Sequence, residues 1–403
     1  MTILYGCPRS RTEIAMRTGS LSQFAGVRLM TLGDGAERGV RMLDFRTGSG
    51  LRFTVMVDRG MDIAEVEHNG RSIGWHSPTG FRHPAYFDAE SEDGLGFTRS
   101  FSGFLATCGL DHILGAEEVP ALNYNYPRRA TARHGLHGRV ANLPARLTGY
   151  GETWENDHCT LWAEGIVVQA TVFGEVLHLH RRIEADVGGD EIRLTDRVVN
   201  AGFAPTPHMY FYHINIGHPV IDDGSRYLAP IRDVVWASHT ASYRAQGVGY
   251  RTLSAPREGF AEQVWQHDMA PDTAGEVPVA VVNDRLAFGI EVTTRHDQLP
   301  CAYQWQNLQV GHYVMGIEPS THHVLGNLAA RERGEMIWLS AGEGRDYSAR
   351  FRVLNGGPAI AAAEARIRGT QVQPDDDYPT PSGHFAPLTG RPQPHNLKGR
   401  DRP

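Results

Sequence analysis

The stretch "LWAEGIVVQATVFGEVLHLHRRIEADVGGDEIRLTDRVVN", residues 161–200, decides the fold class. It is rich in Val, Ile, Leu and Thr and contains a Gly-Gly pair that supplies a tight turn, so it predicts antiparallel strands. Successive side chains of a strand point to opposite faces, which places Leu177 and Leu179 on one face. His178 and His180 lie on the other face, and we interpret them as the solvated side of a strand.

The same pattern continues on both sides of this stretch. Strand-like segments separated by glycine-containing turns run from Val27 to Ser77 and again from "VPVAVVND" to "YSARFRVLN". They recur at the short spacing typical of a large sandwich. Helical signals are few, and the clearest is "AIAAAEARIR" after Pro358. The sequence therefore predicts an all-β fold, a large antiparallel β-sandwich with few short helices.

Three regions are expected along the 403 residues: an N-terminal arm over 1–22, one sandwich domain over 23–356, and a C-terminal extension over 357–403. Sandwiches of this class commonly exceed roughly 200 residues as one domain. Beyond Arg368 the extension is rich in Pro, Gly and charge and cannot bury enough apolar surface to offset its ordering entropy. We expect that tail to be disordered or to lie extended along a neighbour. The sequence leaves open whether the chain forms a homo-oligomer.

Composition and charge limit the kinds of molecule that the protein is expected to bind. A hydrophobic fraction of 41% and a charged fraction of 21% describe a globular protein, and the net charge of −7 with no long basic run argues against nucleic acid. The N-terminus lacks a secretory h-region and no run of apolar residues is long enough to span a membrane, so we expect a cytoplasmic protein with no membrane partner. The four cysteines are far apart, which favours reduced structural thiols. A small-molecule ligand is expected.

Glu318, in "GIEPS", stands between Ile317 and Pro319 after an apolar run. An ionised carboxylate that is removed from water is costly unless it is paired or hydrogen-bonded. Glu318 therefore has either a structural partner or a chemical task, unless it is simply a solvated residue at the end of a strand.

Two histidine-bearing stretches precede it. In "RHGLHGR", His134 and His137 sit among glycines, so the backbone can approach a ligand closely and an imidazole can project from a turn. In "PHMYFYHINIGHP", strand alternation places His213 on the same face as Met209 and Phe211. A core histidine that is bonded to a carbonyl is the alternative interpretation of His213.

Taken in order, "GLHG", "YHINIG", "GIEPS" and "MIWLSAGEGRDYSARFRVL" resemble the motifs of the aldose 1-epimerase, or galactose mutarotase, family. The motifs "VDRGMDI", "TCGL" and "GIEPST" resemble a divergent bacterial branch. The resemblance implies a β-sandwich with the sugar site in a groove, Glu318 as general base, His213 as general acid, and His137 holding the sugar ring. One departure is that Tyr212 stands before His213, where better-known members carry Asn, so their hydroxyl recognition cannot be transferred.

The chemistry implied by the family suits these residue types. Interconverting the anomers of a sugar means taking a proton from the C1 hydroxyl while one is delivered to the ring oxygen, so an acid and a base must face one hemiacetal. No convincing dinucleotide or phosphate-binding loop is present, and we expect no cofactor and no metal. A metal held by His134, His137 and His213 is the weaker alternative, because the sequence shows no carboxylate motif that would hydrogen-bond these imidazoles and orient them toward a metal.

Further side chains are candidates to bind the sugar. Trp305 offers a ring on which a pyranose could stack, although a strand Trp is often core. Arg59 and Arg99 are donors by their position in the resembling motifs, although Arg59 could instead pair with a neighbouring aspartate. The remaining candidates are His134, Gln304, Gln306, Asp111 and His112.

Arg128, Arg129, Arg133 and Arg139 surround the "HGLHG" turn, which suggests an acidic sugar, or merely a solvated basic loop. The leading hypothesis is a mutarotase that acts on a free sugar. The same acid and base could also serve an isomerase, epimerase or lyase that acts next to the carbonyl of a keto or uronic sugar. A carbohydrate-binding protein without turnover is the third hypothesis.

Overall fold

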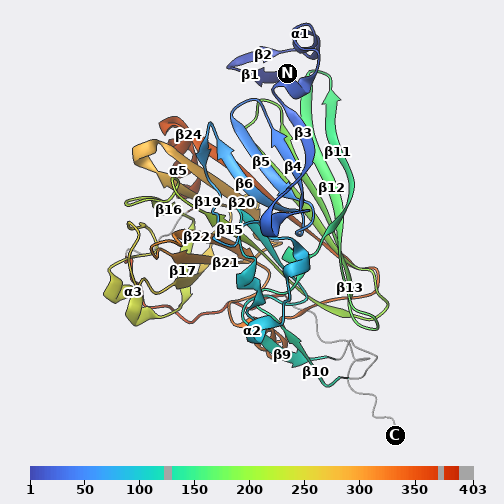
Figure 1. Ribbon diagram of the computed structural model, residues 1–403. Coiled ribbons are helices and arrows are strands. Elements are labelled where there is room, and N and C mark those ends of the chain that lie inside the picture. Colours follow the sequence, from blue (N-terminus) through green and yellow to red (C-terminus); the bar gives the residue numbers. More distant parts are fainter. Residues whose placement is uncertain (122–128, 371–375, 390–403) are drawn as a thin grey trace.

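The computed structural model describes residues 1–121, 129–370 and 376–389. Three large antiparallel sheets make up most of this part of the chain, as Figure 1 shows, and the predicted all-β sandwich is confirmed. The described residues also contain short helices: α1 (Arg11–Ala15), α2 (Ser91–Gly94), α3 (Thr240–Gln246), α4 (Gly326–Glu332) and α5 (Gly357–Arg368). The helix predicted after Pro358 is α5.

The largest sheet has eight strands in the order β11-β12-β13-β14-β24-β20-β19-β16. Leu177 and Leu179 of β13 are fully buried while His180 is exposed, so the predicted alternation is confirmed. The strands are β11 (Ala145–Glu155), β12 (His158–Ala170), β13 (Val176–Asp186), β14 (Glu191–Asn200), β24 (Gly344–Asn355), β20 (Phe288–Arg295), β19 (Glu276–Asn283) and β16 (Arg226–Leu228).

The second sheet runs β17-β18-β21-β22-β15-β23, and β8 pairs with β15 as well. Every residue of β15 and β22 is buried, because both faces of these strands are covered. Tyr212 and Ile317 face the main core together with residues of the large sheet, whereas Phe211 belongs to a second apolar cluster on the other face. The strands are β8 (Leu105–Leu110), β15 (Thr206–Ile216), β17 (Ile231–Ala237), β18 (Gln263–Met269), β21 (Cys301–Asn307), β22 (Val314–Ser320) and β23 (Ile337–Leu339).

The third sheet is a meander close to the N-terminus, where the sequence predicted short strands without an intervening helix. Its order follows the chain, and its strands are β3 (Gly26–Thr31), β4 (Arg41–Arg46), β5 (Leu51–Met56), β6 (Asp62–His68) and β7 (Arg71–Ser72). Two hairpins complete the described strands: β1 (Thr2–Leu4) with β2 (Cys7–Arg9), and β9 (Glu117–Pro120) with β10 (Thr131–His134).

A buried ion network ties the three sheets together. Arg181 of β13 donates to both carboxylate oxygens of Asp196 on β14, at 2.8 and 2.7 Å, and to Asp62 of β6 at 2.6 Å. The same guanidinium donates to the hydroxyls of Thr107 and Tyr210 on β8 and β15. Removing one partner of such a buried group leaves an uncompensated charge, so the network fixes how β15 lies on the large sheet.

Both chain ends contact the sandwich. In the N-terminal arm, the backbone N–H of Thr2 donates to the Asp157 carbonyl in the β11–β12 turn. In the C-terminal extension, α5 packs on β19 and β24, and the N–H groups of Ser382 and Gly383 donate to β17. Residues 376–389 therefore lie extended along this chain's own sheet edge, while 371–375 and 390–403 fall outside the described residues.

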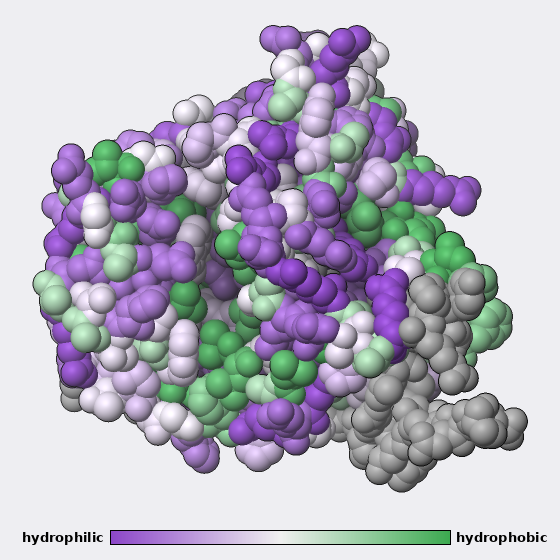
Figure 2. Space-filling model, turned by 60° about the horizontal axis from the view of Figure 1, so that its bottom comes forward, coloured by the Kyte–Doolittle hydropathy of each residue, from purple (hydrophilic) through white to green (hydrophobic). Residues whose placement is uncertain are grey.

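No helix in the described ranges is long and apolar enough to cross a membrane. The four cysteines are free thiols, and all except Cys7 are buried. Seen from below, the molecule is hollowed near the centre of its face, with hydrophobic residues gathered beside the hollow (Figure 2).

Candidate active site

Glu318 and His213 lie on neighbouring strands and face each other. The register of β15 against β22 pairs Ile214 with Ile317, so the residues one step away, His213 and Glu318, are opposite and share a face. Nε2 of His213 lies 3.3 Å from Oε1 of Glu318. Each residue is only 4% exposed, so Glu318 is not a solvated residue at the end of a strand.

Gly316 makes room for this pair. Its backbone lies on the same face, and a Cβ atom there would sit 2.7 Å from Oε1 of Glu318, 3.2 Å from Cε1 of His213 and 3.3 Å from Cβ of Trp305. Any larger residue would push against the carboxylate and the imidazole together. The glycine of "GIEPS" is therefore required by the close packing of the site.

Aromatic rings surround the imidazole of His213. The ring centroids of Phe101 and Trp305 lie 4.7 and 5.3 Å from it, and that of Phe211 lies 5.8 Å away. Phe101 and Trp305 are only half-buried, whereas Phe211 is buried. The indole N–H of Trp305 donates to Oε2 of the exposed Glu262 at 3.0 Å. Phe101, Trp305 and Phe211 thus form an aromatic rim around the contact between His213 and Glu318.

His137 also reaches this cluster, from the "GLHG" turn. Its ring centroid lies 5.6 Å from that of His213 and packs on Phe211 at 5.1 Å. The turn needs glycine after the histidine: Gly138 has φ of +78°, and a Cβ there would meet the Gly109 carbonyl oxygen at 2.2 Å. Nδ1 of His137 is buried and has no hydrogen-bond partner among the described residues.

Burial shifts the two central groups in opposite directions. It raises the pKa of Glu318 from 4.5 to about 8, and the negative charge of Glu262 adds to this shift. Burial lowers the pKa of His213 from 6.5 to about 3, and Asn215 opposes this only in part. At neutral pH the pair therefore carries one transferable proton, on Glu318, and no net charge.

Arg59 is almost fully buried, at 3% exposure. One guanidinium nitrogen, Nη2, donates to the Ser100 carbonyl, next to Phe101 of the aromatic rim. Nε and Nη1 are buried and have no hydrogen-bond partner in the described parts of the chain. The expected alternatives do not supply one either, because Asp58 pairs with Arg41 and Asp62 with Arg181.

Two residues predicted to bind the sugar lie elsewhere. Arg99 is 63% exposed and pairs with Glu92 on the surface. Gln304 points to the opposite face of β21 from Trp305, where its amide is already bonded to His267 and to the Tyr250 carbonyl. Both assignments are corrected: strand alternation puts Gln304, like Gln306, on the core side.

His134 and Asp111 join a separate buried cluster rather than the acid–base pair. Nδ1 of His134 lies 4.0 Å from Oδ2 of Asp111, and its ring stacks on His112 at 5.0 Å. Asp111 accepts a hydrogen bond from Gln169 at 2.7 Å. No contact of His134 or Asp111 with His213 or Glu318 is found among the described residues.

Two of the arginines around that turn are ion-paired. Arg133 pairs with Asp93 at 3.6 Å, and Arg139 pairs with Glu90 at 3.1 Å and with Glu175 at 3.3 Å. Arg128 lies outside the described residues. Arg133 and Arg139 therefore already have carboxylate partners, and the role of this loop in binding an acidic sugar stays a prediction.

Several residues of the site were missed from the sequence. Phe101, in "RSFSG", lies in a segment without strand periodicity, and Trp75 lies at the end of the strand-like region that was predicted up to Ser77; their rings lie 5.4 Å apart. Glu262 follows a glycine-containing loop and looks like any exposed acid. Only Gly316 carried a usable signal, because a glycine inside a strand pattern suggests a close approach.

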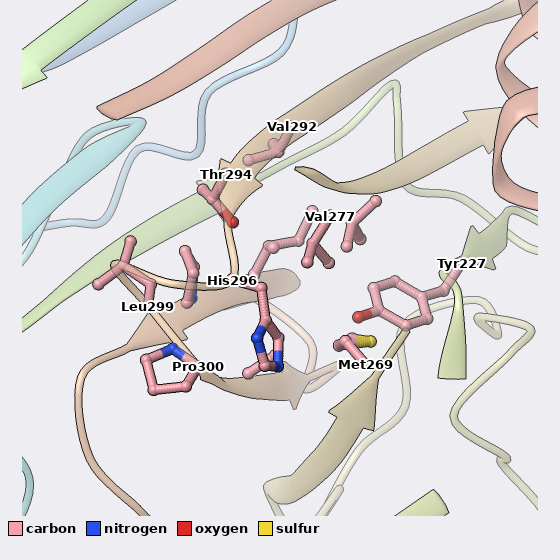
Figure 3. Close-up of a pocket in the computed structure, with 12 residues that line it drawn as sticks. Tyr227, Met269, Val277, Val292, Thr294, His296, Leu299 and Pro300 are labelled. Atoms are coloured by element: carbon pink, nitrogen blue, oxygen red, sulfur yellow. The ribbon is translucent and has the colours of Figure 1, made fainter. Parts of the chain in front are cut away.

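A cavity on the other face of β21 and β22 is not a competing site. Figure 3 shows it lined mainly by apolar side chains, among them Met269, Val277 and Leu299, with His296 and Tyr227 as polar members. It contains no acid–base pair. Across the described residues, no group of three or more His, Cys, Asp and Glu side chains is arranged to hold a metal ion.

Residues 37–353 match the family described as "Domain of unknown function (DUF4432)". The chain belongs to the DUF4432 family. The matched region includes Arg59, His137, His213 and Glu318. No curated protein matches this DUF4432 chain.

Solved structures share the fold of this DUF4432 chain. A Klebsiella pneumoniae protein, named provisionally as an aldose 1-epimerase, has a TM-score of 0.78 and 25% identity, covering 86% of this chain and 88% of its own. A galactose mutarotase-like protein from Clostridium acetobutylicum has a TM-score of 0.55 and 11% identity, with 83% and 99% covered. Galactose 1-epimerase from Lactobacillus acidophilus has a TM-score of 0.50 and 11% identity, covering 82% of this chain and 99% of its own. The predicted resemblance and the sandwich fold are confirmed.

Proposed function

We propose that this protein is a cofactor-independent mutarotase that interconverts the anomers of a free sugar. The observation that carries the proposal is the buried contact of 3.3 Å between Nε2 of His213 and Oε1 of Glu318 beneath an aromatic rim. A pair that differs in pKa and shares one proton supplies an acid and a base at the same place. The fold that the chain shares with galactose mutarotase-like proteins supports the same function.

The reaction needs two coupled proton transfers on one carbon. The base takes the proton of the C1 hydroxyl, the C1 oxygen becomes a carbonyl, the bond from C1 to the ring oxygen breaks, and the acid protonates that ring oxygen. Rotation about the C1–C2 bond then exposes the other face of the carbonyl. Ring closure runs the transfers in reverse, so each of Glu318 and His213 serves once as donor and once as acceptor.

The position of the shared proton at neutral pH decides which of Glu318 and His213 is the acid, and which the base, in the first step. The family resemblance implies Glu318 as base and His213 as acid, which requires the proton to be on His213. The structure favours the proton on Glu318, and both arrangements hold the same number of protons. A bound sugar selects between them through the hydrogen bonds that it offers to each group. Either arrangement starts the same cycle, in one direction or the other.

Other residues of the site position the ring. Trp305 and Phe101 present half-buried aromatic faces on which the C–H face of a pyranose can stack. His137 lies beside His213 with an unpartnered Nδ1 and is placed to bond a sugar hydroxyl. These contacts hold C1 against the acid–base pair, which is how orientation contributes to catalysis.

Exchange in D2O tests this function against the runner-up. A mutarotase interconverts the anomeric protons of a sugar without placing deuterium at C2, because only hydroxyl protons move. An isomerase or epimerase acting beside the carbonyl removes a C–H proton and incorporates deuterium there, and a lyase forms a double bond that absorbs in the ultraviolet. Deuterium at C2, or a new ultraviolet band, would replace the proposal with the corresponding alternative.

A further inference from the structure

Two arginines, Arg59 and Arg82, form no ion pair with a carboxylate in the part of the chain that the structure describes. Within the described residues, Nε of Arg82 is buried without a hydrogen-bond partner, as are Nε and Nη1 of Arg59. The two cations are close enough for the charge of Arg82 to lower the pKa of Arg59, which burial already lowers to about 10. Like charges are brought together only at a cost, so a group that binds both would stabilise this arrangement.

Arg59 and the loop that leads to Arg82 both contact the segment that carries Phe101. Arg59 donates to the Ser100 carbonyl, and the loop that leads to Arg82 is tied to the same segment. The Ser77 N–H donates to the Ser102 hydroxyl at 3.0 Å, and the Thr79 hydroxyl donates to the Phe101 carbonyl at 3.4 Å. Because the ring of Phe101 lies 4.7 Å from that of His213, the segment that Arg59 contacts reaches from this arginine to His213.

The acids near these arginines are engaged by other donors. Asp62 is bonded by Thr107 and by Arg181, and Oε1 of Glu37 accepts the Phe81 N–H at 2.7 Å. Their charges still favour the charged form of Arg59, but they do not satisfy its free N–H groups. Those donors need acceptor oxygens, and guanidinium groups bind oxyanions in preference to single hydroxyls because several N–H groups can be used at once.

We propose that Arg59 and Arg82 form a subsite for an oxyanion of the substrate, a carboxylate or a phosphate ester placed at the end of the sugar remote from C1. This inference rests on the proposed function, because it places C1 at Glu318 and His213. It moves the anion contact from the ion-paired arginines of the "HGLHG" turn to two arginines with three buried nitrogens, Nε and Nη1 of Arg59 and Nε of Arg82, that have no hydrogen-bond partner in the described residues. The substrate class is then an acidic sugar such as a uronate or a sugar 6-phosphate.

Binding of methyl glycosides tests the subsite separately from turnover, because a methyl glycoside has no free hemiacetal and cannot change anomer. Titration calorimetry would compare methyl glucuronide, methyl galacturonide and the 6-phosphates of methyl glucoside and methyl galactoside with their neutral parents. The proposal expects at least one anionic probe to bind about tenfold or more tightly than its parent. Comparing the affinities of the methyl uronides with those of the 6-phosphates shows which oxyanion the subsite prefers. Equal affinity for every charged and neutral pair, or no binding of any anionic probe, would overturn it.

Two arginine variants distinguish a specific contact with the anion from a general effect of removing one positive charge. Arg82→Gln should abolish the preference for the anionic probe and leave binding of the neutral parent unchanged. Arg99→Gln is the matched control, since it removes an arginine that is exposed and paired with Glu92 on the nearby surface. Thermal melting checks that both variants are folded. An undiminished preference in Arg82→Gln, or an equal loss in the control, contradicts the inference. Failure of the mutarotase proposal would look different, as anomer exchange that does not respond to Glu318→Gln.

Discussion

His213 and Glu318 lie on the adjacent antiparallel strands β15 and β22, with Nε2 and Oε1 3.3 Å apart. Both are almost completely buried, and burial acts on them in opposite senses, because it disfavours the anion of one and the cation of the other. The pair therefore keeps a single proton over a wide range of pH. Burying two titratable side chains costs free energy of folding, and a chemical role beside the aromatic rim would account for that cost.

Replacing Gly316 with alanine should disturb the site while His213 and Glu318 themselves remain unmutated. The added Cβ would lie 2.7 Å from Oε1 of Glu318, so the carboxylate must move. We expect kcat to fall by about tenfold or more, with a loss of stability of about 1–3 kcal/mol from overpacking. Gly33→Ala is the control, because a Cβ there meets nothing within 4 Å. Unchanged kcat in Gly316→Ala would show that the close approach of His213 and Glu318 has no bearing on turnover.

The stability of the protein should depend on pH through Glu318. Its pKa is raised from 4.5 to about 8 on folding, so its favourable contribution is complete below pH 4.5 and is lost as pH rises through 8. Relative to Glu318→Gln, which does not titrate, the wild type should lose up to about 5 kcal/mol across this range, since each pKa unit corresponds to about 1.4 kcal/mol. Urea unfolding of both proteins at several pH values measures the difference. A difference that stays constant with pH would mean that Glu318 ionises normally.

Glu262 should tune the alkaline limit of activity. Its negative charge helps to raise the pKa of Glu318, after the larger effect of burial, and its carboxylate accepts from Trp305. In Glu262→Gln the hydrogen bond to Trp305 can persist while the charge is lost. The alkaline limb of the kcat/KM profile should then move to lower pH, because Glu318 loses its proton more easily. Glu258→Gln, an exposed acid of the same loop, should leave the limb in place. An identical profile for all three proteins would refute this.

The strands, and Glu318 and His213 as candidates for one site, could be picked out from the sequence, but the surroundings of the two residues could not. Leu177 and Leu179 reveal their strand by alternation, and Glu318 drew attention as a carboxylate in an apolar run. Gln304 was misplaced because composition does not tell which face of β21 packs on the main core and which carries Trp305. Phe101 and Arg82 come from loops whose course is set by hydrogen bonds between distant segments, and no local period encodes those.

The buried network around Arg181 should be a main determinant of stability. Arg181→Met removes the cation between Asp62 and Asp196 and leaves two carboxylates buried together. We expect a loss of about 3–5 kcal/mol in the free energy of unfolding. Arg182→Met is the matched control on the same strand, because its partners Glu164 and Glu184 are partly exposed and such pairs contribute about 0–1 kcal/mol. Similar losses in the two variants would contradict a special role for the network.

Exchange between the two anomeric protons of a free sugar, measured by NMR saturation transfer, tests the central claim most directly. The wild type is run against a panel of neutral and acidic sugars, with Glu318→Gln and His213→Asn beside it under the same conditions. We expect transfer in the wild type on at least one sugar and a loss of about a hundredfold or more in each variant, both still folded. Full exchange rates in both folded variants, or no enzyme-dependent transfer on any sugar of the panel, would contradict the assignment of His213 and Glu318 as the acid–base pair of a mutarotase.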